Sequence, residues 1–262
     1  QGFKSVIGQV PQGPTKKNKN LFYLEKPKEM NEEEIQEVIE AFAKAAARAA
    51  GAGADAVQLH GAHGYLISEF LSPFLNRRTD KWGGSDENRF RFVREVFREV
   101  RKVLPGDMPI LIKMNANDYT PKTGITPELA KKYAGWLVEL GINAVELSGG
   151  TFFTTHVIRG EIPADDFAKA AVGLGLPKWM KFLAKLNLKK LAPKCSFEEG
   201  YNLEAAKIVK PVLGEVPLML VGGMRRLSYM EELIEKKYAD FISISRPLIR
   251  EPFLIRQFKE GK

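Results

Sequence analysis

The chain has 262 residues, 44% of them hydrophobic, which is enough for one substantial core, and no apolar stretch approaches the ~20 residues of a membrane span. Its single cysteine, Cys195, excludes an internal disulfide framework and a self-contained four-cysteine iron–sulfur site, and it fits a reducing cytoplasm. The formal net charge of +8 comes from Lys and Arg interleaved with Glu along predicted helices, which favours a solvated surface over a nucleic-acid partner and would suit an anionic cofactor or substrate.

Residues 1–28 contain Gly, Pro and a basic run but no clear hydrophobic period, so we expect an extended loop there. A regular pattern follows. Asn31 with Glu34 three residues later forms a capping-box sequence, and apolar residues continue at helical spacing up to Gly51. This pattern predicts a long amphipathic helix.

The rest of the chain alternates between short apolar runs and amphipathic segments. The apolar runs predict strands at 55–60, 109–114, 144–148, 217–222 and 240–245. The amphipathic segments predict helices from Ser85 to just before Pro105, from Thr126 to Gly141, from Asn202 to Leu213, from Ser228 to Lys237 and near 252–260. Residues 151–200 interrupt this rhythm, and we expect them to form a cap or long loop near the strand ends, within a single domain over 1–262.

Strand–helix alternation with apolar strands predicts an α/β fold in which helices cover a parallel sheet, as in a TIM (β/α)8 barrel. The length of the chain is within the usual size of such a barrel. The sequence nevertheless provides five predicted strands, whereas a complete barrel has eight. We therefore expect a partial barrel whose sheet has open edges.

His60, His63 and Tyr65 directly follow the first predicted strand. In α/β folds of this kind the chemistry takes place where the strands end, so we interpret these residues as catalytic. Metal ligation is the other interpretation of two neighbouring histidines, but no carboxylate or cysteine lies nearby at ligand spacing. For Tyr65 the alternative is a core tyrosine bonded to the backbone.

Residues 60–73, HGAHGYLISEFLSP, and residues 76–89, NRRTDKWGGSDENR, form one long ordered pattern. This pattern resembles the Old Yellow Enzyme family of FMN-dependent ene-reductases, and family-like pieces follow it to the end of the chain. The resemblance implies an oxidoreductase that uses FMN to transfer hydride from NADH or NADPH to an activated alkene, a small enone-like or enoate-like molecule. It also implies that the five predicted strands are barrel strands four to eight.

The same resemblance implies a role for each residue near the first two strands. His60 and His63 match positions that donate hydrogen bonds to the activating oxygen of the substrate, and Tyr65 matches the residue associated with proton delivery to the α-carbon. Lys113 stands where many family members have arginine beside flavin N1 and O2. It keeps the positive charge but loses the planar guanidinium.

Two further strand ends are expected to hold the FMN phosphate, again by resemblance. Gly222 and Gly223 end the fourth predicted strand, where a tight turn alone is the alternative interpretation. Ser245 and Arg246 end the fifth strand and resemble the Gly-Arg pair of the family. Together these strand ends correspond to the usual phosphate site of a barrel.

Two other groups of polar residues follow strands. The loop at 76–85 is expected to seat the next helix, with no catalytic role for Arg77 or Asp80. Asn115, Asn117 and Asp118 follow the second strand, and we expect them to line the mouth of the site near the substrate.

The strand count leaves alternatives to an active enzyme. The chain could be a catalytically inactive partial barrel that needs a partner chain, or a second copy in a homo-oligomer, to supply barrel strands one to three. It could also be a flavin-free phosphate-binding barrel, supported by Gly222, Gly223 and Arg246. The second alternative leaves the His60, His63 and Tyr65 group unexplained.

Overall fold

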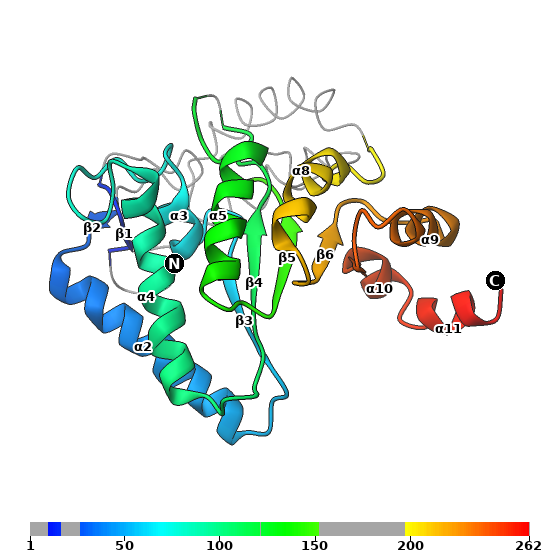
Figure 1. The fold of residues 1–262 in the computed structure, drawn as a ribbon, viewed down its shortest axis with the longest axis horizontal. Helices are drawn as coiled ribbons and strands as arrows, with labels where there is room; N and C mark the ends of the chain where they lie inside the picture. Colours follow the sequence, from blue (N-terminus) through cyan, green and yellow to red (C-terminus); the bar gives the residue numbers. More distant parts are fainter. Residues whose placement is uncertain (1–9, 17–26, 121, 152–196, 262) are drawn as a thin grey trace, which may run out of the picture.

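The computed structural model describes residues 10–16, 27–120, 122–151 and 197–261. At its centre lie parallel strands, hydrogen-bonded to one another in chain order (Figure 1). These strands are β3 (Val57–Gly61), β4 (Ile110–Asn115), β5 (Ala144–Ser148), β6 (Leu218–Val221) and β7 (Phe241–Ser243). All five predicted strands are confirmed: 144–148 has the predicted bounds, and the boundaries of the other four are shifted by one or two residues.

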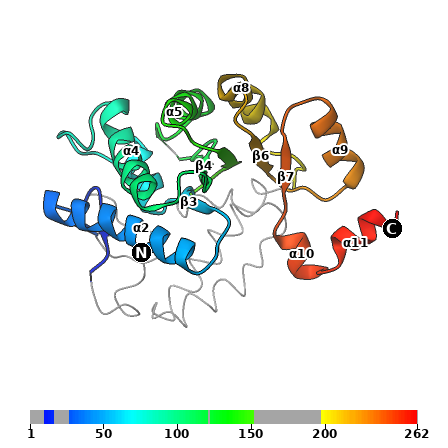
Figure 2. The same cartoon turned by 60° about the horizontal axis from the view of Figure 1, so that its bottom comes forward.

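The longer helices precede or connect these strands and lie in an arc along one side of them (Figure 2). They are α2 (Glu32–Gly51), α4 (Asp86–Val103), α5 (Pro127–Glu139), α8 (Leu203–Leu213) and α9 (Leu227–Glu235). Three of them begin at the predicted caps. Asn31 forms the complete capping box with Glu34, and the hydroxyls of Ser85 and Thr126 accept hydrogen bonds from backbone N–H groups in the first turn.

Side chains alternate along the strands, so the sheet has two different faces. One face packs under the helices and is apolar, as shown by the burial of Leu59, Ile112 and Leu147. The opposite face carries polar side chains. On that face, β3 pairs with β4 so that His60 lies opposite Lys113, and β4 pairs with β5 so that Lys113 lies opposite Glu146. In a barrel this polar face is the interior.

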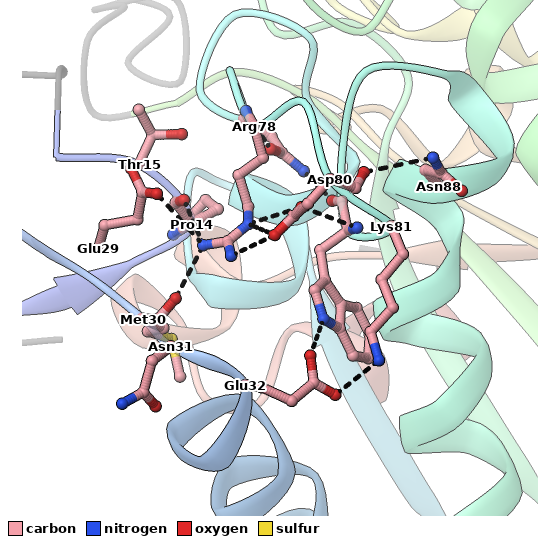
Figure 3. A network of polar contacts seen from close by, with 12 residues as sticks. Pro14, Thr15, Glu29, Met30, Asn31, Glu32, Arg78, Asp80, Lys81 and Asn88 are labelled. Carbon is pink, nitrogen blue, oxygen red and sulfur yellow. Dashed lines mark hydrogen bonds and ion pairs between the residues drawn. The ribbon is translucent and has the colours of Figure 1, made fainter.

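The region before α2 contains more structure than the predicted loop. β1 (Gln12–Gly13) pairs in parallel with β2 (Lys28–Glu29). Arg78 links this ladder to the rest of the molecule (Figure 3). Its guanidinium donates to the backbone oxygens of Pro14 and Met30, at 3.1 and 2.8 Å, and forms an ion pair with the Asp80 carboxylate at 2.6 Å. The Arg78 side chain is 9% exposed, so the loop at 76–85 contributes to the packing of the N-terminal region.

Two short helices are absent from the sequence-based prediction. α3 (Leu66–Leu71) begins directly after Tyr65, and α10 (Arg246–Arg250) begins directly after Ser245. β7 therefore ends before Ser245, which occupies the N-cap position of α10 and is not the last residue of a strand. The chain then forms α11 (Leu254–Lys259), which confirms the helix predicted near 252–260.

Most of the predicted insertion at 151–200 lies outside the described residues, as does Cys195. Within the described ranges, none of the helices combines the length and the apolar character needed to cross a membrane.

Candidate active site

The end of β3 brings His60, His63 and Tyr65 together. The ring centroids of His60 and His63 are 5.4 Å apart in an edge arrangement, and those of His60 and Tyr65 are 4.7 Å apart. Tyr65 is 43% exposed, and His60 is also exposed, so neither ring serves to fill the core. Three side chains with exchangeable protons, two histidines and a tyrosine, therefore lie close together at the carboxyl end of a strand.

His63 is held in an unusual backbone conformation. Its φ of 60° lies in the left-handed region, which costs energy for a residue other than glycine. Its backbone N–H donates to Oδ1 of Asn115 at 3.0 Å, and its ring Nε2 lies 2.7 Å from the Ser148 hydroxyl. Contacts from β4 and β5 thus fix a residue that follows β3.

Both histidines are shifted toward the neutral form. Burial, with smaller contributions from His60 and the Lys113 ammonium, lowers the pKa of His63 to about 4. Partial desolvation and the Lys113 charge lower the pKa of His60 as well. At neutral pH each ring is therefore uncharged, with one nitrogen able to donate a hydrogen bond and the other able to accept one.

Lys113 has a partner that the sequence-based interpretation missed. Its Nζ lies 3.2 Å from Oε1 of Glu146, and the side chains are 25% and 8% exposed respectively. The Glu146 carboxylate also accepts from Nε2 of Gln58 at 2.9 Å. The available signal was the single acidic residue within the otherwise apolar strand 144–148, because a buried carboxylate requires donors.

Asn115 and Asp118 do not line an open mouth, contrary to expectation. Both are fully buried. The Asp118 carboxylate accepts from Nδ2 of Asn115 at 2.8 Å, from the Ser72 hydroxyl at 2.5 Å and from the backbone N–H of Ile125 at 2.9 Å. Burial raises the pKa of Asp118 against the opposing effect of these donors. This network supports Asn115, which in turn holds the backbone of His63.

Gly222 and Gly223 follow β6 directly, and Gly223 has a φ of 67°. A Cβ on Gly223 would lie 2.7 Å from the backbone oxygen of Glu198, so the chain itself requires glycine there. The backbone N–H groups of Gly223 and Met224 have no hydrogen-bond acceptor within the described residues. The turn is therefore tight and also carries donors that a ligand could use.

Arg246 and Ser245 lie beside this turn, since Val221 of β6 pairs with Ser243 of β7. Arg246 is exposed. The next backbone donors along the turn, those of Arg225 and Arg226, already bind one oxygen of the Glu199 carboxylate at 2.7 and 2.8 Å. An anion at this corner would therefore use the amides closer to Gly223 and the guanidinium of Arg246.

The predicted site residues thus form two groups on or just after the strands, toward the carboxyl ends of the sheet. His60, His63, Tyr65 and Lys113 belong to β3, β4 and the segment after β3, whereas Gly222, Gly223, Ser245 and Arg246 follow β6 and β7. β5, with Glu146 and Ser148, lies between them. No cluster of three or more His, Cys, Asp or Glu side chains suited to a metal ion occurs in the described part of the chain.

Parallel strands that follow one another in chain order and are covered by helices on one face have the arrangement of part of a TIM barrel. Residues 4–163 match the family model described as the NADH:flavin oxidoreductase / NADH oxidase family. The chain belongs to this family, and the resemblance to Old Yellow Enzyme is confirmed.

Curated relatives agree with this assignment. An NADPH dehydrogenase of Clostridium acetobutylicum is 34% identical over 229 residues, which are 87% of this chain and 56% of that protein. An NADH oxidase of Thermoanaerobacter brockii is 33% identical over 236 residues, 90% of this chain and 31% of that protein. The chain thus spans about half the length, or less, of these relatives.

Solved structures show the same fold. A 2-naphthoyl-CoA reductase matches with a TM-score of 0.77 at 26% identity, covering 97% of this chain and 33% of that one. Morphinone reductase in complex with tetrahydroNAD matches with a TM-score of 0.67 at 22% identity, covering 97% of this chain and 60% of that one. At that identity the second likeness concerns the fold alone.

Proposed function

We propose that this chain provides the substrate-facing part and the phosphate-binding part of an FMN-dependent oxidoreductase that passes hydride from NADH or NADPH to an activated alkene. The observation that carries the proposal is the grouping of His60, His63 and Tyr65 at the carboxyl end of β3, next to Lys113 on β4. A structural role alone does not explain why two neutral imidazoles and an accessible phenol share one position.

In this proposal the histidines bind the activating oxygen of the substrate. A neutral imidazole N–H donates to a carbonyl or nitro oxygen, and the hydrogen bond strengthens as negative charge develops there. The same bond draws electron density away from the β-carbon of the alkene. The lowered pKa values of His60 and His63 are compatible with this role, because a neutral ring retains one donor.

Tyr65 would deliver the proton to the α-carbon. Its phenol is exposed at the site and its ring lies against His60, so the same substrate could contact both side chains. A hydroxyl that is neutral at pH 7 suits proton donation to a carbon that has gained electron density.

FMN, when bound, supplies the hydride-transfer chemistry. The residues present fit an anionic cofactor in two places. Lys113 puts an ammonium on the polar face of the sheet, where it would bind the pyrimidine edge of the flavin. At the ends of β6 and β7, the backbone donors at Gly222, Gly223 and Ser245 and the exposed guanidinium of Arg246 would hold the phosphate.

The assembly and location are also proposals. Among the described residues β3 and β7 are the edge strands of the sheet, and in the working enzyme we propose that further strands from a partner chain or a second copy would cover them. A cytoplasmic location rests on the single cysteine alone.

The test separates the two half-reactions in the complete protein. Purified protein should carry an oxidised-flavin absorbance band, be reduced by NADH or NADPH and be reoxidised by 2-cyclohexenone. His60→Ala should slow reoxidation about 100-fold, as expected for loss of one oxyanion donor, and leave reduction by nicotinamide unchanged. Tyr65→Phe is the matched variant that keeps the oxygen donors and removes the proton.

Two results would overturn the proposal. A preparation that stays colourless and inactive with NAD(P)H after FMN is added would exclude a flavoenzyme. Equal losses in both half-reactions for His60→Ala would exclude a role in polarising the substrate oxygen.

A further inference from the structure

Ser148 has a single partner for its hydroxyl. The residue ends β5 and is 3% exposed, and its Oγ lies 2.7 Å from Nε2 of His63. No other group among the described residues makes a hydrogen bond with that hydroxyl. The contact joins β5, which carries none of the predicted site residues, to the histidine beyond β3.

The direction of this hydrogen bond follows from burial. If Nε2 carried the proton and donated to Oγ, the hydroxyl proton of Ser148 would be buried without an acceptor. Buried donors in native proteins are paired, so the arrangement that satisfies both atoms has the hydroxyl donating to a bare Nε2. The His63 ring is neutral near pH 7, because its pKa is lowered to about 4. A neutral ring whose Nε2 is bare carries its proton on Nδ1.

We propose that Ser148 is a positioning residue that fixes the tautomer of His63, so that Nδ1–H is the single donor that this ring offers to a substrate oxygen. Nδ1 has no hydrogen-bond partner among the described residues and is therefore available. The backbone bond from His63 to Asn115 holds the residue at its positive φ, while Ser148 decides which nitrogen carries the proton. The role of Nδ1–H in binding a substrate oxygen rests on the proposed function. The tautomer of His63 can be measured independently of that function.

Nitrogen-15 NMR of the complete labelled protein reads the tautomer directly, because protonated and bare ring nitrogens resonate far apart. The ring signals that disappear in His63→Gln are those of His63. We expect a protonated Nδ1 and a bare Nε2 in the wild type. Ser148→Ala should move the proton partly or wholly to Nε2, and Ser148→Thr, which keeps the hydroxyl, should preserve the wild-type tautomer.

A binding measurement gives the consequence for the site. With phenol as the probe oxygen ligand, Ser148→Ala should weaken binding about two- to fivefold, because only the fraction of rings in the competent tautomer binds. Ser148→Thr should restore the affinity.

A wild-type spectrum with the proton on Nε2 would overturn the inference without any variant, even if Ser148→Ala fails to fold. An unchanged tautomer in folded Ser148→Ala would do the same. Neither measurement needs turnover, so a failure of the proposed reductase activity and a failure of the tautomer assignment are distinguishable.

Discussion

The Nζ of Lys113 on β4 lies 3.2 Å from Oε1 of Glu146 on β5, whose side chain is 8% exposed. Gln58 on β3 donates to the other carboxylate oxygen at 2.9 Å. Three neighbouring strands therefore contribute to one polar cluster on the face that carries His60. A buried carboxylate is costly unless donors surround it. The Glu146 carboxylate therefore requires its contacts with Gln58 and Lys113, and the contact with Lys113 fixes the orientation of the lysine side chain.

Glu146→Gln removes the negative charge and retains the shape of the side chain. It leaves the Lys113 ammonium facing a neutral amide, and hydrogen bonds to charged groups contribute more than neutral ones. We expect the free energy of unfolding to fall by about 2 kcal/mol, measured as a shift in the urea midpoint. Glu37→Gln, on the exposed face of α2, is the matched control and should change little. Equal effects of the two substitutions would contradict a coupled pair.

The stability of the protein should depend on pH through His63. Its pKa is lowered to about 4 from an ordinary value of 6.5, so between these values the unfolded chain binds a proton that the folded protein does not. Protonation then favours unfolding. The resulting loss of stability is absent above pH 6.5 and grows as the pH falls toward 4. At ~1.4 kcal/mol per pKa unit it reaches at most about 3.5 kcal/mol.

Denaturation of wild type and His63→Gln across this pH range measures the effect. Their difference in stability should shrink by the stated amount as the solution is acidified, because glutamine does not titrate. Parallel curves would show that His63 titrates normally.

Asp118→Asn tests the network beneath His63. The carboxylate accepts from three donors, and an asparagine would turn an NH2 group toward one of them. We expect a loss of about 2 kcal/mol in urea denaturation, since one buried donor becomes unsatisfied. Asp107→Asn, on an exposed turn, is the control. A variant as stable as the control would mean that the carboxylate is not required.

Arg78→Lys tests how the N-terminal ladder is held. Lysine keeps the charge but cannot reach two backbone oxygens and the Asp80 carboxylate at once (Figure 3). We expect faster proteolytic cleavage near β1 and β2 and a loss of about 2 kcal/mol in stability. Arg77→Lys changes an exposed neighbour and should leave cleavage at the wild-type rate. Cleavage at the same rate in both variants would show that Arg78 does not anchor the ladder.

The sequence alone determined the elements that depend on local patterns. Strands appeared as apolar runs, and the caps at Asn31, Ser85 and Thr126 are side chains that bond within their own helix turn. The motif around His60 identified the family for the same reason, since its residues are contiguous. The short α3 and α10 were missed because a helix of five or six residues carries too little periodicity to be recognised.

Only the tertiary structure decided which polar residues meet across strands. Glu146 and Lys113 are far apart in the chain, and so are His63 and Ser148, yet the strand register makes them neighbours. The same packing buried Asn115 and Asp118, which the sequence placed near the substrate. Contiguous residues could therefore indicate the class of reaction. The hydrogen-bond and ion-pair partners of the site residues, their burial and their protonation states arise from contacts between distant segments, so only the tertiary structure could reveal them.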